Sequence, residues 1–328
     1  MRNELRTTCG LVVLLLGAAC GDEVDPNATD ITNVFFTKTD ANCAAYVGSY
    51  RSAVRDVARD VSFNGRVTIT DEGSSCAITS NSIPNHDFND GNQAFVNSSA
   101  EATMTFSIPA SPQAAGSTTD LTLQYDDAIF LNGVKLDILA AACYGVGNAP
   151  AGQEKIGCMG SGGQPFRYDP MSPLNTFGTD THNAHTQPGG EYHYHGDPRA
   201  MHDESDTSSP SPVVGFAADG FPIFGPFFTD PQTGEVRRAT SSYALKSGVR
   251  ASQTYNGTTY DPSGAGGAFA GEDYNGRFID DYEYVLGSGD LDVCNGMTVN
   301  GQYGYRITDT YPWVMRCFKG TPDSSFRK

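Results

Sequence analysis

The chain has 328 residues, and its formal net charge is −17 at pH 7. A hydrophobic share of 38% and a charged share of 18% are typical of a globular protein and exclude a largely disordered chain. So acidic a composition also argues against binding to nucleic acid through a basic patch, and we expect no nucleic-acid partner.

The N-terminal 19 residues have the order of a secretory signal. Two arginines precede an apolar run over 11–16, and small residues lead to Cys20. The run is shorter than the roughly 20 residues that span a bilayer, so we expect a removable signal. Cys20 after small residues resembles a bacterial lipobox, although Gly17 stands where Leu is typical. This implies acylation of Cys20; the alternative is ordinary signal-peptidase cleavage nearby.

The expected organisation therefore has three parts. We expect a signal peptide over 1–19, a lipid-anchored tether over 20–30 and a single β-rich domain over 31–328. The protein would be exported and held at a membrane by its lipid, in the periplasm or at the cell surface.

Six cysteines remain once the signal and Cys20 are set aside, an even number that suits an oxidising compartment. None shows the CxxC spacing of a zinc knuckle or redox enzyme, so we expect structural disulfides. They fall as three pairs that are local in sequence, and we expect the bridges Cys43–Cys76, Cys143–Cys158 and Cys294–Cys317.

Short alternating segments, bounded by Gly, Pro, Asn and Asp, predict a mainly β fold. They cover 65–70, 102–108, 121–125 and 303–308. Apolar residues spaced three and four apart predict a helix over 44–61, although β-branched valines there leave a strand possible. We expect a β-sandwich or jelly-roll-like body with few short helices and long loops pinned by disulfides, one of them over 148–188.

Five of the six histidines fall in one window, around Tyr192-His-Tyr-His195. On a strand, His193 and His195 share one face and the two tyrosines share the other. Two such imidazoles can chelate a transition metal, with zinc or copper preferred. His185 could fold back through the turn at 188–190 and supply a third nitrogen. The alternative is that these histidines satisfy hydrogen bonds in a polar core without a metal.

Tyr192-His-Tyr-His195, followed by Gly196, resembles the signature of the YHYH-domain family. Further segments resemble family blocks in the same order, with Ser82 and Val293 standing where Gly and Glu are usual. These segments are 81–86, 132–134, 183–188, 212–225, 291–296 and 308–322. The resemblance spans roughly 61–322 and implies an exported, β-rich domain without implying a reaction.

The matched blocks suggest additional site residues. His86 could join His185, His193 and His195 as a ligand, and Asp219 could be a ligand or could orient a ligand imidazole. The alternative for Asp219 is that it only shapes its Asp-Gly turn.

Two further expectations concern loops. His182 and His202 lie in polar loops, where we expect solvent exposure. Asp290 and Asp292, with Asn295, could offer oxygen ligands to calcium, although the EF-hand spacing is absent.

The sequence contains no GxSxG, HExxH or phosphate-binding glycine motif, so it assigns no reaction. The first hypothesis is a non-enzymatic extracytoplasmic lipoprotein that holds copper or zinc. The second is a metalloenzyme with an open coordination position, for which Asp219 or Tyr194 would be the general base. The third is a domain that recognises carbohydrate or protein through aromatic residues such as Trp313.

Overall fold

The computed structural model describes residues 26–160 and 163–328. The expected signal peptide, Cys20 and most of the tether lie outside these residues. Within them, no helix is both long enough and apolar enough to cross a membrane.

Five strands form the first sheet, in the order β1-β2-β3-β4-β5. They are β1 (Thr29–Asp30), β2 (Gly48–Asp56), β3 (Val61–Asp71), β4 (Ser75–Ser80) and β5 (Met104–Pro109). β2 to β5 run antiparallel, and β1 joins β2 in parallel. Buried and more exposed positions alternate along β3 and β4, so one face supplies Val67, Ile69 and Ile78 to the core.

The helix expected over 44–61 is wrong. A short 3-10 helix, η1 (Cys43–Tyr46), is followed directly by β2 and then by the start of β3. Val54 is buried, whereas Val57 and Val61 are 47% and 44% exposed, so the valines do not form one apolar helical face. Their branched side chains favour the strand, and pairing with β3 decides the outcome.

The second sheet has eight strands in the order β19-β20-β12-β11-β7-β8-β10-β9. They are β7 (Ala128–Phe130), β8 (Lys135–Leu136), β9 (Ala184–Thr186), β10 (Tyr192–Tyr194), β11 (Val213–Ala217), β12 (Pro222–Phe224), β19 (Gly296–Val299) and β20 (Gln302–Arg306). β10 pairs with β8 in parallel and with β9 antiparallel, so it lies near one end of the sheet.

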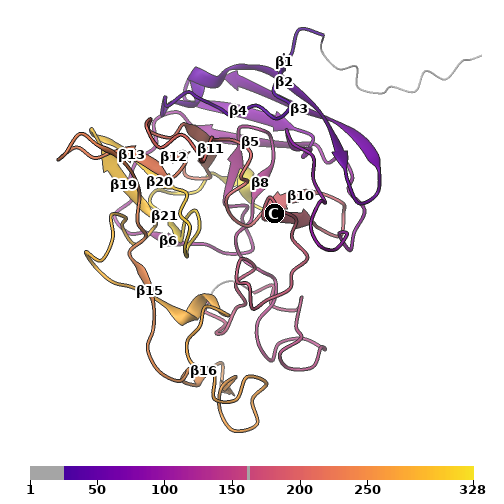
Figure 1. Ribbon diagram of the computed structural model, residues 1–328, viewed down its shortest axis with the longest axis vertical. Helices are drawn as coiled ribbons and strands as arrows, with labels where there is room; N and C mark the ends of the chain where they lie inside the picture. Colours follow the sequence, from indigo (N-terminus) through magenta and orange to yellow (C-terminus); the bar gives the residue numbers. More distant parts are fainter. Residues whose placement is uncertain (1–25, 161–162) are drawn as a thin grey trace, which may run out of the picture.

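The two sheets share one hydrophobic core. Figure 1 shows the first sheet as the upper layer, above the strands of the second. Ile78 and Ile108 from the first sheet belong to the same buried cluster as Phe130, Phe216 and Tyr194 from the second. The mainly β fold class is therefore confirmed.

Short hairpins and single turns complete the described residues. The pairs are β6 (Thr119–Asp120) with β21 (Cys317–Phe318), β13 (Phe227–Thr229) with β14 (Val236–Arg238), β15 (Tyr243–Leu245) with β18 (Tyr282–Tyr284), and β16 (Gln253–Tyr255) with β17 (Thr258–Tyr260). Two more 3-10 turns are η2 (Ile279–Asp281) and η3 (Ser324–Phe326). The strand expected over 121–125 is wrong, because these residues turn there, with the Tyr125 amide bonded to the Thr122 carbonyl.

Three disulfides join Cys43 to Cys76, Cys143 to Cys158 and Cys294 to Cys317, the pairs expected from their spacing. The second bridge lies in the long connection from β8 to β9, whose described residues form isolated bridges and turns but no named strand. A separate small core around Phe166 and Phe278 lies next to it. Three disulfides indicate an extracytoplasmic protein.

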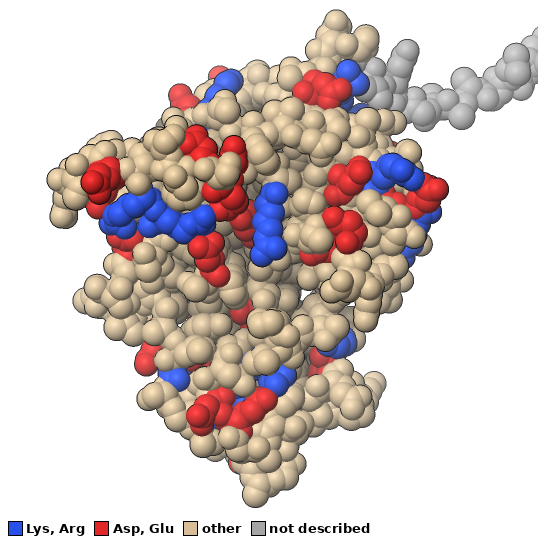
Figure 2. Space-filling view, in the orientation of Figure 1, with Lys and Arg blue, Asp and Glu red and all other residues tan. Residues whose placement is uncertain are grey.

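Charged side chains of both signs are mixed over the surface. On the face drawn in Figure 2, Lys and Arg side chains lie beside Asp and Glu side chains and form no broad basic patch. On this face, basic side chains therefore remain close to acidic ones, in a chain whose formal net charge is −17.

Candidate metal centre

The β9–β10 hairpin brings three histidines together. His185 in β9 lies directly opposite His193 in β10, so the two side chains share one face of the sheet. His195 is two residues beyond His193 and returns to that face. The turn between the strands closes where the Gly190 amide donates to the Gln187 carbonyl, with Gly190 at a positive φ of 87°.

The three imidazole rings form a nearly equilateral triangle. Their centroids lie 4.8 Å apart for His185–His193, 4.8 Å for His185–His195 and 4.7 Å for His193–His195. One ligand nitrogen from each ring lies within 4.8 Å of the others. His193 and His195 are buried, and His185 is partly buried. We call these three residues the histidine triad.

The hydrogen bonds of the triad leave nitrogen lone pairs facing inward. His185 Nδ1 lies 2.7 Å from the Phe177 carbonyl, which can only accept, so Nδ1 carries the proton and Nε2 is bare. His195 Nδ1 lies 3.4 Å from the Ile138 carbonyl and favours the same tautomer. The two Nε2 atoms are 3.2 Å apart. Two lone pairs at this distance repel each other unless a cation or a proton lies between them.

The dimensions and the remaining nitrogen also fit a metal. Ligand nitrogens about 2.0–2.1 Å from a tetrahedral zinc are roughly 3.3 Å apart, close to the 3.2 Å between the two Nε2 atoms. The Nδ1 atom of His193 is buried and has no hydrogen-bond partner among the described residues. An unpaired buried nitrogen costs about 1–3 kcal/mol, and coordination would remove that cost.

Burial also prepares the triad electrostatically. It lowers the pKa of His193 and His195 well below the ordinary value for imidazole, and it lowers the pKa of His185. Desolvation is the largest cause at all three residues, because it disfavours the charged imidazolium. Neutral imidazole is the form that binds a metal.

The tyrosines of the motif occupy the opposite face of β10. The Tyr192 hydroxyl donates to Asp180 Oδ2 at 2.8 Å, and the Tyr194 hydroxyl lies 2.6 Å from His86 Nε2. His86 Nδ1 lies 2.6 Å from the Asp87 carbonyl and donates to it, so Nε2 accepts from Tyr194.

His86 is therefore placed apart from the triad. It stacks on the partly buried His182, with ring centroids 3.7 Å apart, and burial lowers its pKa to about 3. The expectation that His182 is solvent-exposed is also wrong, since its side chain is only 17% exposed.

Asp219 is likewise placed away from the triad. Its carboxylate accepts from the Tyr305 hydroxyl at 2.6 Å and from the Gly320 amide at 2.8 Å. It precedes β12, which β11, β7 and β8 separate from β10. Asp219 thus holds the β11–β12 turn against β20 and against the segment that follows β21.

The carboxylates proposed for calcium have protein partners. Arg237 forms a two-pronged ion pair with Asp290, with N–O distances of 2.8 and 2.6 Å. Asp292 accepts from Lys319 Nζ at 3.1 Å and from two backbone amides. Asn295 Oδ1 is buried without a hydrogen-bond partner among the described residues, but both carboxylates are already paired, and a single amide oxygen does not make a calcium site.

A second cluster went unrecognised in the sequence. His202 is 2% exposed, so its expected solvent exposure is wrong. Its Nε2 lies 2.7 Å from Glu204 Oε1 and 4.0 Å from Asp197 Oδ2. Glu204 also pairs with Arg238 at 2.5 Å, so a guanidinium already neutralises this carboxylate. The His-x-Glu spacing was the available signal, but sequence alone could not show that this loop folds inward.

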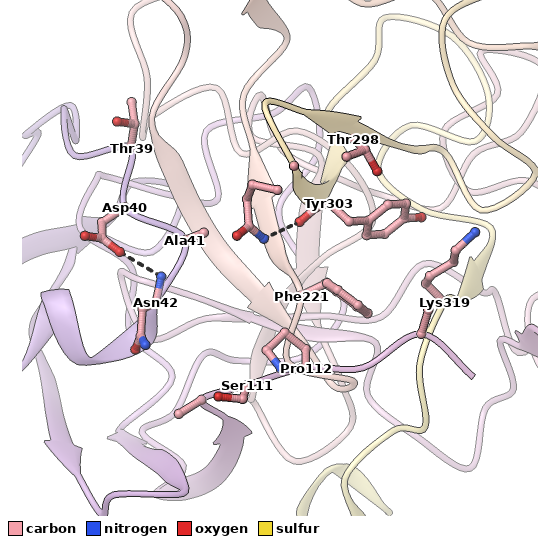
Figure 3. A pocket seen from close by; sticks show the side chains of 14 residues that line it. Thr39, Asp40, Ala41, Asn42, Ser111, Pro112, Phe221, Thr298, Tyr303 and Lys319 are labelled. Carbon is pink, nitrogen blue, oxygen red and sulfur yellow. Dashed lines mark hydrogen bonds between the residues drawn. The ribbon is translucent and has the colours of Figure 1, made fainter. Parts of the chain in front are cut away.

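A surface pocket of about 760 Å³ has no histidine among its lining residues. Figure 3 shows this pocket from close by. Phe221, Tyr303 and Lys319 lie on one side of it, and Asp40 and Asn42 lie on the other. The lining mixes aromatic rings with polar groups.

Comparison with known protein families supports the resemblance seen in the Tyr-His-Tyr-His motif. The family model described as YHYH protein matches residues 105–320. The chain belongs to the YHYH family. The match includes the second sheet and the whole triad, whereas His86 and β1 to β4 lie before it. No curated protein and no solved structure matches the chain.

Proposed function

We propose that this YHYH-family protein is an extracytoplasmic metal-binding protein in which His185, His193 and His195 hold one copper or zinc ion. The observation that carries the proposal is the 3.2 Å separation of two inward-facing Nε2 atoms whose rings donate through Nδ1. Imidazole nitrogens suit copper and zinc better than calcium or magnesium.

The triad by itself does not define a reaction. Among the described residues, no fourth His, Cys, Asp or Glu belongs to its ligand group. A bound zinc or copper ion would supply Lewis acidity at a fourth position open to water or another ligand. Tyr194 points to the other face of β10, and Asp219 is engaged with Tyr305, so neither proposed general base faces the triad. A binding function therefore has more support than catalysis.

Metal analysis of protein purified without a His tag tests the proposal. After incubation with Cu²⁺ or Zn²⁺ and removal of excess ion, we expect about one metal per chain. The double substitution His193→Ala and His195→Ala should abolish this binding. His182→Ala is the matched control, because it removes an imidazole outside the triad and should retain the metal. Fewer than about 0.2 metal ions per wild-type chain would refute the proposal, since a formed site should fill.

We also propose that a lipid on Cys20 anchors the protein to a membrane. The signal-like order of residues 1–19 supports this location, as do the three disulfides. Mass spectrometry of the mature N-terminus should find acyl chains on Cys20, and Cys20→Ser should release the protein from membranes. An unmodified N-terminus would remove the anchor and leave the metal proposal intact.

The pocket in Figure 3 favours recognition of a neutral oligosaccharide as a second candidate function. The half-buried Tyr303 ring and Phe221 offer apolar surface on one side of the pocket, and Asn42 offers polar atoms on the other, a combination suited to polar ligands with apolar faces. Titration with cellohexaose and chitohexaose, followed by calorimetry, tests it. Binding that survives loss of the triad and disappears in Thr298→Trp would support this function; no heat with either sugar would count against it.

A further inference from the structure

A buried lysine lies between two carboxylates beside the triad. Lys135 opens β8, pairs in register with His193 of β10, and is 3% exposed. Its Nζ atom lies 3.0 Å from Asp126 Oδ1 and also contacts Glu191 Oε1. Asp126 is 5% exposed. Both of these carboxylate oxygens are buried and lack a hydrogen bond of good geometry among the described residues.

An ion pair in this position is costly. Each buried ion loses a large part of its hydration free energy. The attraction of its partner offsets this loss only when the remaining hydrogen bonds are also formed. Ammonium groups contact Asp126 Oδ1 and Glu191 Oε1 without forming a hydrogen bond of good geometry, so this condition is not met. Burial raises the pKa of Asp126, which shows the same penalty on its charged form.

The fold holds the amine and the carboxyl group in place. Asp126 is two residues before β7, and Lys135 begins the neighbouring antiparallel strand β8. The Asp127 amide donates to the Leu136 carbonyl, and the Asp126 amide donates to the Phe326 carbonyl, so both backbones are fixed. Such a fixed approach of two reactive groups can replace a large part of the entropy cost of a bimolecular step.

We propose that Lys135 and Asp126 join in an intramolecular isopeptide bond. Lys135 Nζ forms the new C–N bond to the Asp126 carboxyl carbon, and one C–O bond of that carboxyl group breaks. Starting from an ammonium and a carboxylate, the amide keeps one proton on nitrogen, and the other two leave with the departing oxygen as water. The step is a condensation with no change of oxidation state, so no oxidant or reductant is required.

Neighbouring groups suit this reaction. Lys328 Nζ lies 3.2 Å from the same Asp126 Oδ1, where its positive charge would stabilise the oxyanion formed when nitrogen adds to the carboxyl carbon. Glu191 contacts the attacking nitrogen and positions it. Exclusion of water disfavours the ion pair relative to the neutral amide. The product replaces two buried charges with a neutral group that needs fewer partners.

Mass spectrometry of the full mature chain tests the bond without any variant. After denaturation, reduction and alkylation, we expect a mass about 18 Da below that of the unlinked chain, which corresponds to one lost water. Chymotrypsin cleaves after Phe130, between the two residues, and should leave a branched pair of peptides joined through Lys135 and Asp126. Full mass with separate peptides overturns the proposal.

Substitutions assign the linkage. Each of the single variants Lys135→Met and Asp126→Ala should have the full mass calculated from its own sequence, because neither can form the bond. The control Asp30→Ala, at an exposed ion pair with Arg51, should still be about 18 Da lighter than its calculated mass. Glu191→Gln should leave an increased fraction of unlinked chain. A branch at Lys328 instead of Lys135 would also overturn the assignment. Because these masses are read with or without chelator, the result is independent of whether the triad binds metal.

Discussion

The Tyr194 hydroxyl donates to His86 Nε2 across 2.6 Å, on the face of β10 opposite the histidine triad. The same hydroxyl accepts from Asn132 Nδ2 at 2.9 Å, so it ties the first sheet's last loop to the β7–β8 turn. The motif Tyr-His-Tyr-His therefore has two separate roles. Its tyrosines fix the strand in the core, and its histidines form the candidate metal site.

The first prediction separates these two roles. Tyr194→Phe keeps the ring but leaves His86 Nε2 and Asn132 Nδ2 short of a buried partner. We expect the free energy of unfolding to fall by about 1–3 kcal/mol, measured by urea denaturation. Metal stoichiometry should not change. A loss of metal with unchanged stability would contradict the separation of the two faces.

The second prediction concerns stabilisation by the metal. An ion that binds only the folded state adds about 2.7 kcal/mol when its concentration is 100 times the dissociation constant. Zinc or copper should therefore raise the Tm of wild type and of His182→Ala in calorimetry. It should not raise the Tm of His185→Ala. An equal rise in all three proteins would place the bound ion outside the triad.

The third prediction uses Asp169, which is 1% exposed and accepts from Trp313 Nε1 at 3.1–3.2 Å. Burial raises the pKa of this carboxyl group from 3.8 to about 7. Between these two values the folded state holds a proton that the unfolded state has released. The contribution of Asp169 to stability is therefore present below about pH 4 and is lost as the pH rises to about 7.

The buried histidines whose pKa values are lowered make the protein more stable as the pH rises, which is the opposite of the Asp169 effect. The variant Asp169→Asn keeps these histidines, so comparing it with wild type isolates the contribution of Asp169. The wild-type free energy of unfolding minus that of the variant should fall by up to about 4 kcal/mol from pH 4 to pH 7. Fluorescence of Trp313, the sole tryptophan, should titrate near pH 7 in wild type only. A difference that does not vary with pH would disprove the assignment.

The fourth prediction concerns a buried ion pair in the long connections outside the two main sheets. Arg250 and Asp281 form a fully buried ion pair with N–O distances of 2.7 and 2.8 Å. Asp281→Ala leaves the buried guanidinium with only one carboxylate contact, the longer one of 3.5 Å to Glu272, and should cost about 3–5 kcal/mol in urea denaturation. The matched control, Glu101→Ala at a partly exposed ion pair with Arg66, should cost at most about 1 kcal/mol. Similar losses in the two variants would show that burial does not control the effect.

Local chemistry in the sequence was sufficient for several features. The period of two along a strand predicted that His193 and His195 share a face, and the structure shows this. The turn after Gln187 correctly suggested that His185 folds back beside them. The spacing of the cysteines suggested the three bridges. Each of these relations joins residues that are close in sequence, so few alternative arrangements compete.

Residues that depend on distant partners were harder to predict. His86 and Tyr194 are 108 positions apart, and their hydrogen bond, which places His86 on the far face, exists only after the two sheets pack. The segment 44–61 has apolar spacing that fits a helix, but pairing with β3 makes most of it a strand. His202 lies in a polar stretch, yet Glu204 and the surrounding loops bury it.

By itself, the sequence determined that this is a β-rich, disulfide-containing chain with three histidines on one hairpin, because period, turn chemistry and cysteine spacing act over short distances. Only the tertiary structure decided which groups share a buried environment. It separated His86 and Asp219 from the triad and enclosed Lys135 between Asp126 and Glu191. The physical reason is that burial and desolvation depend on how both sheets and their loops pack together.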